Sequence, residues 1–241
     1  GDGVSTAKLG SGKEASSILR KNIIEAFKEK ASLLKDEISI KEFCSKVIAK
    51  SNIDIIESIK TKVDITKETP SGIMATTLIL AVIVRNKMYY TSIGDSRLFI
   101  YSEKDGLNLL NYEDNVMNLK LANGMAWDKV VNSEGIHAIT RYIGGGSFKD
   151  GNLFPRKFNI SIHCLELEPG EIIIICSDGV TDYINKSYYN DDLWKVTESL
   201  ERIIKENKQK SLEVLNNKII TEANLNGGGD NITIITSKIL K

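Results

Sequence analysis

The sequence has few of the side chains that bind soft metals or form disulfides. Of its 241 residues, two are histidines and three are cysteines. Cys44, Cys164 and Cys176 form no Cys-x-x-Cys pair, and His137 and His163 stand apart from one another. Zinc or copper sites built from thiolates and imidazoles therefore have no candidates here. An odd number of unpaired cysteines also argues against a disulfide framework, so we expect a reducing, cytoplasmic setting.

Neither an excess of one charge nor a long apolar run is present. Lys plus Arg and Asp plus Glu number 32 each, which gives no reason to expect a polyanionic partner. The longest apolar run, Ile73 to Val84, contains two threonines and is shorter than the roughly 20 residues that a membrane-spanning helix requires. We therefore expect no nucleic-acid partner and no membrane partner, and we expect the chain to be a monomer.

Two helical patterns open the chain and two lie near its carboxyl end. Apolar residues recur at helical spacing over residues 12–34, and again in a second helix that begins near Ser39. Ser39 and Glu42 resemble a capping box, which is typical of a helix start. The later helices are predicted over residues 191–206 and 211–225.

The remaining sequence is mostly typical of β-strands. Short turns separate several of these runs, which favours antiparallel pairing. The expected strands cover residues 76–84, 88–93, 97–101, 160–167, 171–176 and 232–236. We expect 160–167 and 171–176 to form a hairpin and 144–158 to be irregular. Because helices do not alternate regularly with strands, the sequence predicts one layered α+β domain over residues 1–241, with antiparallel sheets.

Four aspartates stand where apolar runs meet glycine-containing turns. They are Asp2 in Gly-Asp-Gly, Asp95 in Gly-Asp-Ser, Asp178 in Ser-Asp-Gly, and Asp230 in Gly-Asp-Asn. One such aspartate alone is more often structural, because Asp and Gly are common in turns. Several carboxylates at neighbouring strand ends would repel one another unless cations lay between them. Oxygen ligands suit hard cations such as Mg²⁺ and Mn²⁺, so the four together predict a metal site.

Six short stretches, in this order and spacing, carry a resemblance that covers nearly the whole chain. They are Gly1–Val4, Ala75–Thr77, Ile93–Arg97, Ile139–Arg141, Ser177–Asp182 and Gly229–Thr233. Together they resemble the motifs of metal-dependent protein phosphatases of type 2C, and bacterial members look closest. The resemblance implies a four-layer α-β-β-α sandwich of two antiparallel sheets flanked by helix pairs. It also implies hydrolysis of phosphoserine and phosphothreonine in a phosphoprotein partner, such as the target of a cognate kinase.

The resemblance also implies a role for each aspartate. Asp2 would bridge two metal ions, and the backbone carbonyl of Gly3 would bind the second. Asp178 and Asp230 would complete the first site, and Asp95 with Asp178 matches an acidic pair that holds a weaker third ion in some members. The expected catalytic residues are therefore Asp2, Asp178 and Asp230, with Mn²⁺ or Mg²⁺ as cofactor. Two such ions lower the pKa of a bridging water, which supplies a hydroxide for in-line attack on phosphorus.

Departures from the family pattern leave an alternative function open. Ser5 and Thr6 replace the usual glycine pair, and Val4 stands where many eukaryotic members have a histidine. The chain begins inside its first motif, so we expect preceding strands with a further acidic residue and a phosphate-binding arginine. The alternative is a catalytically impaired pseudophosphatase that acts as a protein-binding module. A haloacid-dehalogenase-like phosphatase is disfavoured, because Val180 occupies the place of its second aspartate.

Overall fold

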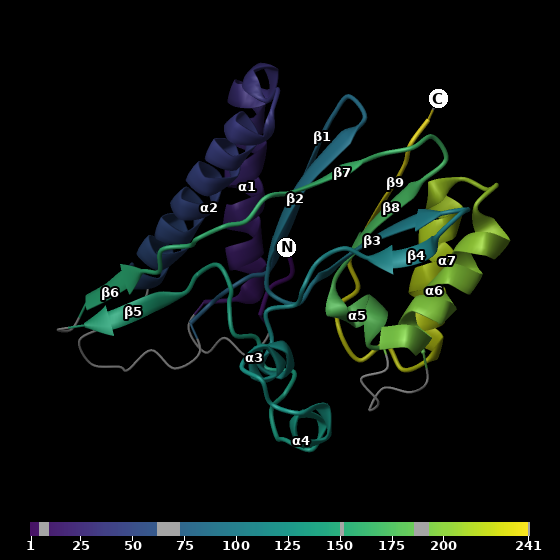
Figure 1. Ribbon diagram of the computed structural model, residues 1–241. Coiled ribbons are helices and arrows are strands. Elements are labelled where there is room, and N and C mark those ends of the chain that lie inside the picture. Colours follow the sequence, from purple (N-terminus) through teal and green to yellow (C-terminus); the bar gives the residue numbers. More distant parts are fainter. Residues whose placement is uncertain (5–9, 62–72, 150–151, 186–192, 241) are drawn as a thin grey trace. The chain divides into compact units, whose positions relative to one another are not determined.

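The chain folds as two compact units, each with its own sheet and core (Figure 1). The computed structural model describes residues 1–4, 10–61, 73–149, 152–185 and 193–240. Unit 1 comprises Gly1–Gly94 and Ala138–Glu166, and unit 2 comprises Asp95–His137 and Leu167–Lys241.

Unit 1 packs two long helices on a three-stranded antiparallel sheet. The helical elements are α1 (Gly12–Lys30), η1 (Ala31–Leu33) and α2 (Glu37–Lys60). The sheet has the order β1-β2-β7, formed by β1 (Leu78–Val84), β2 (Lys87–Ile93) and β7 (His163–Glu166). A separate hairpin, β5 (Gly146–Lys149) and β6 (Asn152–Pro155), contacts α2 through β6. A tight Arg85-Asn86 turn joins β1 to β2, since Val84 pairs with Lys87.

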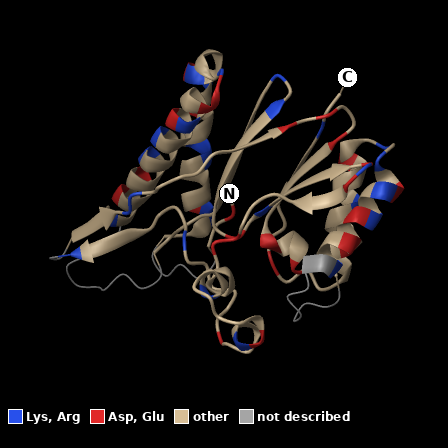
Figure 2. Cartoon of the chain, viewed as in Figure 1, with Lys and Arg blue, Asp and Glu red and all other residues tan. Residues whose placement is uncertain are grey.

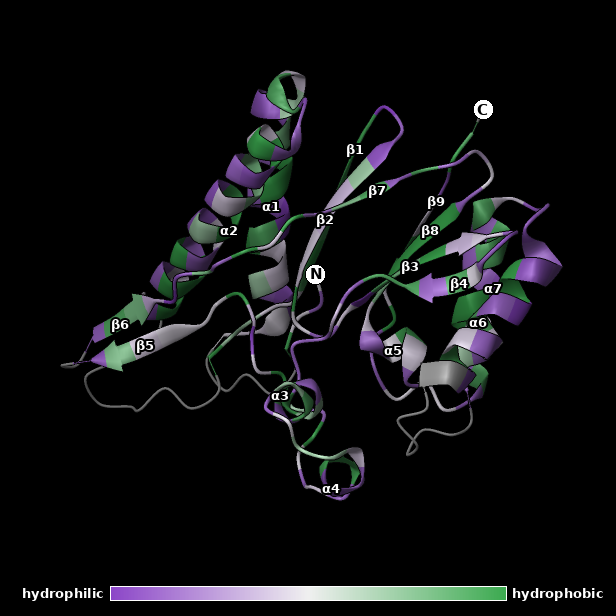
Figure 3. Ribbon diagram, in the orientation of Figure 1, coloured by the Kyte–Doolittle hydropathy of each residue, from purple (hydrophilic) through white to green (hydrophobic). Residues whose placement is uncertain are grey.

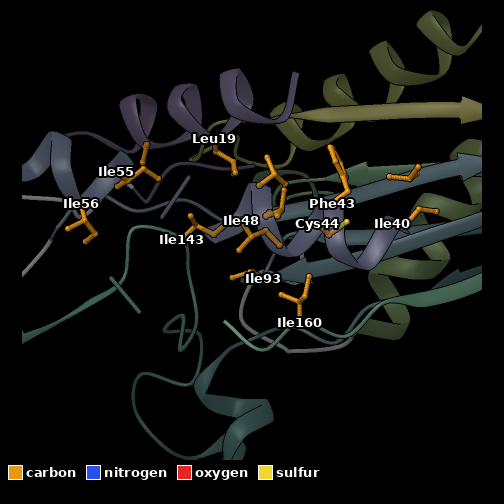
Figure 4. Close-up of a cluster of buried hydrophobic side chains, with 14 of the residues drawn as sticks. Leu19, Ile40, Phe43, Cys44, Ile48, Ile55, Ile56, Ile93, Ile143 and Ile160 are labelled. Atoms are coloured by element: carbon orange, nitrogen blue, oxygen red, sulfur yellow. The ribbon is translucent and has the colours of Figure 1, made fainter. Parts of the chain in front are cut away.

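The core of unit 1 forms where the apolar face of α2 meets the sheet (Figure 4). The α2 residues in this core share the helical spacing visible in the sequence: Phe43, Val47, Ile48, Ile55, Ile56 and Ile59. Ala15 and Leu19 contribute from α1, and Leu78 and Ile93 from the sheet. Burial of this many aliphatic side chains supplies the main favourable term for folding of the unit.

Unit 2 has the same general design with a four-stranded antiparallel sheet of order β4-β3-β8-β9. Its strands are β3 (Arg97–Ser102), β4 (Gly106–Leu109), β8 (Ile172–Cys176) and β9 (Ile234–Lys238). Its helices are α3 (Val116–Ala122), α4 (Trp127–Val131), α5 (Asp178–Thr181), α6 (Leu193–Asn207) and α7 (Leu212–Leu225). The central strand β8 is hydrophobic throughout (Figure 3). Its Ile172 and Ile174 share a buried cluster with Leu200, Ile204 and Ile219 from α6 and α7.

The α+β class with antiparallel sheets and helix pairs is confirmed, and several local expectations are corrected. Helix α2 is capped by Asp36, whose carboxylate accepts a hydrogen bond from the Ser39 amide at 2.8 Å, so Ser39 is the third helical residue and not the cap. The hairpin predicted over 160–176 is wrong, because β7 pairs with β2 whereas β8 pairs with β3 and β9. The Pro169-Gly170 turn is a local signal, whereas strand partners are decided by burial of each strand in its own core.

Further corrections concern elements that the sequence patterns did not indicate. The stretch 144–158, expected to be irregular, contains the β5–β6 hairpin, and β4, α4 and α5 were not predicted. Each of these elements has four or five residues, too few to display a clear period. Among the described residues, no helix combines the length and apolarity needed to cross a membrane. Cys44, Cys164 and Cys176 are all free thiols.

Candidate metal centre

The backbone of Asp2 is held by the two threonines of the Ala-Thr-Thr motif in unit 1. The Asp2 carbonyl accepts hydrogen bonds from the Thr77 amide at 2.8 Å and from the Thr76 hydroxyl at 2.7 Å. The Asp2 amide donates to the Thr77 hydroxyl at 2.9 Å, and Gly3 forms an antiparallel bridge with Thr76. The amide and the carbonyl of Asp2 are therefore both hydrogen-bonded to residues 74 or 75 positions away in the chain. The motif fixes the place from which the Asp2 carboxylate projects.

Gly3, whose carbonyl was expected to bind a metal, lies in direct backbone contact with the start of α1. A Cβ added to Gly3 would lie 2.2 Å from the carbonyl carbon of Gly12, and one added to Gly12 would lie 2.4 Å from that of Gly3. Neither distance is possible for real atoms, so both positions require glycine. Ser11 caps the helix by accepting from the Glu14 amide, which fixes the helix start against this loop.

In unit 2, the segments that carry Asp178 and Asp230 are tied together. Asp178 begins α5 and is separated from β8 by Ser177 alone, and Asp230 lies a few residues before β9. The Ser177 amide donates to the Thr233 carbonyl at 3.0 Å, and the Thr233 amide donates back to the Ser177 hydroxyl at 3.0 Å. The same Ser177 hydroxyl donates to the Asn231 carbonyl at 3.2 Å. The structure therefore brings these two aspartate-bearing segments side by side.

Asp95 belongs to the same end of the unit 2 sheet. Arg97 of β3 pairs with Cys176 of β8, and Cys176 also pairs with Ile234 of β9. Because both pairings are antiparallel, the beginning of β3, the end of β8 and the beginning of β9 share one sheet edge. Asp95, Asp178 and Asp230 stand just beyond those three strand ends. Within this unit, the backbone segments that carry these three aspartates therefore lie at one edge of the sheet.

A buried ion pair lies beside these strand ends. The Arg97 guanidinium donates through Nε to the Glu113 carboxylate, with the two side chains 16% and 10% exposed. The Asn115 amide nitrogen donates to the other oxygen of Glu113 at 2.9 Å. Burial by itself would lower the pKa of Arg97, but the charge and hydrogen bond of Glu113, with the charge of Asp182, raise it. Arg97 therefore remains a cation next to the aspartates.

Asp182 is a titratable member of this cluster to which the sequence patterns gave no role. Burial, and after it the negative charge of Asp178, raise the pKa of its carboxyl to about 6 against the opposing charge of Arg97. A charged Asp178 therefore disfavours ionisation of Asp182, because like charges repel. The spacing of Asp178 and Asp182 could have indicated their proximity, because positions four apart lie on one face of a helical turn. Glu113, in contrast, has no local signal that would pair it with Arg97.

The donor set suits a hard divalent cation. Asp95, Asp178 and Asp230 offer only carboxylate oxygens at the sheet edge, and Asp2 and Gly3 offer a carboxylate and a carbonyl in the other unit. Within the part of the chain that the structure describes, no three His, Cys, Asp or Glu side chains are arranged to hold one ion. One oxygen of Asp178 accepts a hydrogen bond from the Gly179 amide at 2.8 Å, and one oxygen of Asp230 accepts from the Asn231 amide at 2.7 Å. Ser5 and Thr6, the departure from the family pattern, lie outside the described residues.

The motifs can now be compared with those of known proteins. The family model described as "Protein phosphatase 2C" matches residues 1–216. The chain belongs to the protein phosphatase 2C family. This phosphatase 2C chain is 23% identical over 225 residues to the serine/threonine phosphatase stp of Listeria innocua, covering 93% of this chain and 77% of that protein.

Solved structures of phosphatase 2C relatives share the fold. The serine/threonine phosphatase of S. agalactiae matches with a TM-score of 0.73 at 20% identity, covering 100% of this chain and 85% of that one. The catalytic domain of the serine/threonine protein phosphatase PstP, solved with two manganese ions, matches with a TM-score of 0.68 at 16% identity, covering 95% and 82%. The fold expected from the sequence motifs is therefore the fold of this family.

Proposed function

We propose that the chain hydrolyses phosphoserine and phosphothreonine in proteins, with a water molecule activated by Mn²⁺ or Mg²⁺ as the nucleophile. The observation that carries the proposal is that the strand ends beside Asp95, Asp178 and Asp230 lie at one end of the unit 2 sheet. Membership of the protein phosphatase 2C family supports the reaction type. The two manganese ions in the similar PstP structure support the choice of cation.

Each candidate ligand has a proposed role. Asp178 and Asp230 would hold the first ion, Asp2 would bind both ions, and the Gly3 carbonyl would bind the second. Asp95 and Asp178 would hold a weaker third ion. When bound, such ions make hydroxide available near neutral pH and offset negative charge on the phosphoryl group. None of the protein side chains is required as a nucleophile.

The chain's own residues contribute alignment. Thr76 and Thr77 hold the Asp2 backbone, and Ser177 holds together the segments of Asp178 and Asp230. Because these bonds lie within the protein itself, they restrict the backbone from which the proposed ligands project. Alignment of this kind is a recurrent source of rate enhancement, since it removes part of the entropic cost of reaction.

The test is phosphate release from a phosphothreonine peptide by the purified full-length protein. We expect turnover with Mn²⁺ or Mg²⁺, complete loss in excess EDTA, and recovery when Mn²⁺ is added back. Asp95→Asn should slow turnover while leaving the affinity for the two tighter ions unchanged. Full activity in EDTA would contradict the proposal. Tight Mn²⁺ binding without any turnover would instead favour the pseudophosphatase alternative.

A further inference from the structure

Asn52, a side chain in the middle of α2, is fully buried and makes three hydrogen bonds to backbone groups. Its Nδ2 donates to the carbonyls of Gly145 at 3.1 Å and Arg156 at 3.0 Å. Its Oδ1 accepts from the Gly144 amide at 2.7 Å. The partners lie 92 to 104 residues away in the chain, so this amide fixes a distant turn against the helix.

That turn is the outer segment of a short backbone ladder that reaches Asp2. The Thr76 amide donates to the Ile143 carbonyl at 2.8 Å, and the Ile143 amide donates back to the Thr76 carbonyl at 2.9 Å. On its other side, Thr76 bridges to Gly3 and donates its hydroxyl to the Asp2 carbonyl. The ladder therefore runs from Asn52 through Ile143 and Thr76 to the two candidate ligands.

The backbone of this turn lies close to the segment that precedes Thr76. Gly144 has a φ of +101°, and a Cβ at this position would lie 2.5 Å from the carbonyl oxygen of Met74. Met74 itself is fully buried two residues before Thr76. A displacement of Gly144 would therefore press on the strand segment that holds Asp2.

We propose that Asn52 is a positioning residue for the metal centre, acting through the Ile143–Gly145 turn and Thr76 on Asp2 and Gly3. This inference rests on the proposed function, because it takes Asp2 and Gly3 to bind metal. The physical reason is that a buried amide whose nitrogen and oxygen are both hydrogen-bonded holds its partners strongly. Losing it leaves buried carbonyls unsatisfied. Partners that orient metal ligands in this way typically change metal affinity by about 10- to 100-fold when removed.

Asn22 provides a matched control in the same unit. It is 4% exposed, and its Nδ2 donates to the Ser51 hydroxyl at 3.2 Å and to Asp54 at 2.9 Å. These bonds join α1 to α2 and involve no residue of the ladder. Substitution at Asn22 therefore removes a buried amide of the same type without touching the turn that Asn52 holds.

The experiment compares Asn52→Leu and Asn22→Leu in the full-length protein, with two measurements. Hydrogen exchange reports the protection of the Thr76, Thr77 and Val4 amides, with amides of β8 as an internal reference for overall stability. Mn²⁺ titration calorimetry reports affinity. We expect Asn52→Leu to lower the protection of the three ladder amides at least tenfold and to weaken Mn²⁺ binding about tenfold or more. Asn22→Leu should leave both quantities, relative to the reference, within about twofold.

Three results would overturn the inference. They are equal effects of the two substitutions, unchanged ladder protection in Asn52→Leu, and lost protection with unchanged Mn²⁺ affinity. If Asn52→Leu does not fold, the smaller Asn52→Ser variant, which loses both Nδ2 donors, replaces it in the same comparison. Wild-type protein that binds no Mn²⁺ would contradict the proposed function itself, a result that the exchange data on the ladder distinguish from a failure of the Asn52 contact.

Discussion

The two units hold their candidate ligands by different physical means. In unit 1, Asp2 and Gly3 are fixed by uncharged groups, namely the backbone and hydroxyls of Thr76 and Thr77 and the close approach of Gly12. In unit 2, the aspartates stand among charges, with several acidic residues around α5 and the preceding strands (Figure 2). The first arrangement depends on shape and the second on charge. Substitutions that alter volume should therefore act in unit 1, and changes of charge or pH should act in unit 2.

The largest effect is expected from removing a carboxylate in unit 2. Asp178→Asn and Asp230→Asn should each lower kcat/KM by several orders of magnitude, because each removes a charged ligand of the same proposed ion. The double variant should be little worse than either single one, since residues that act as a unit are not additive. Steady-state kinetics on a phosphothreonine peptide provide the measurement. Asp105→Asn, an exposed residue in the turn at the opposite end of β3, is the control. Losses that multiply would mean that the two aspartates do not share an ion.

An intermediate effect is expected from added volume in unit 1. Gly→Ala within a helix normally stabilises it, by up to about 1 kcal/mol. At Gly12 the sign should reverse, because the new Cβ would lie 2.4 Å from a backbone atom of Gly3. Gly12→Ala should lower the free energy of unfolding by about 1–3 kcal/mol, the usual cost of overpacking. Urea denaturation measures this, with the neighbouring exposed Lys13→Ala as control. A stabilised Gly12→Ala protein would show that the backbone contact is absent.

The smallest effect is a pH-dependent one at Asp182. The pKa of this carboxyl is raised from 3.8 to about 6, so the folded state binds its proton more tightly than the unfolded state. The associated stability is present below about pH 4 and is lost as the pH rises through about 6. Asp182→Asn should therefore stabilise the protein above pH 6, by about 1 kcal/mol once solvent screening at this partly exposed carboxyl is allowed for.

The comparison requires thermal unfolding of wild type and Asp182→Asn in EDTA, at pH 4 and pH 7.5. The difference in Tm should be close to zero at the lower pH and positive at the higher one. A constant difference across this range would indicate that the carboxyl of Asp182 titrates normally, and the charge-based description of unit 2 would then be wrong.

The sequence was sufficient for the features that repeat over many residues or stand at abrupt junctions. The apolar spacing correctly predicted a second helix that begins near Ser39, which is α2. The aspartates at strand ends led us to expect their segments at one sheet edge, and the segments of Asp178 and Asp230 are hydrogen-bonded side by side. Both inferences rest on local periodicity and on general properties of strand ends.

The same local reasoning could not predict which distant segments of the chain contact one another. Whether residues 160–176 form a hairpin depends on which sheet buries each strand, and the turn residues alone do not contain that information. The pairing of Arg97 with Glu113, and the three bonds of Asn52, likewise join segments that share no pattern. Such contacts are decided by tertiary packing, which only the three-dimensional structure reveals.

The central claim is that Asp2 in unit 1 and Asp178 in unit 2 each bind Mn²⁺, and Mn²⁺ stoichiometry tests it most directly. Titration calorimetry of the full-length protein should give two tight Mn²⁺ ions per chain, by the two-metal chemistry proposed. Asp2→Asn in unit 1 and Asp178→Asn in unit 2 should each reduce that number, while Asp105→Asn should not. Unchanged stoichiometry in both aspartate variants, or no binding by the wild-type protein, would contradict the account.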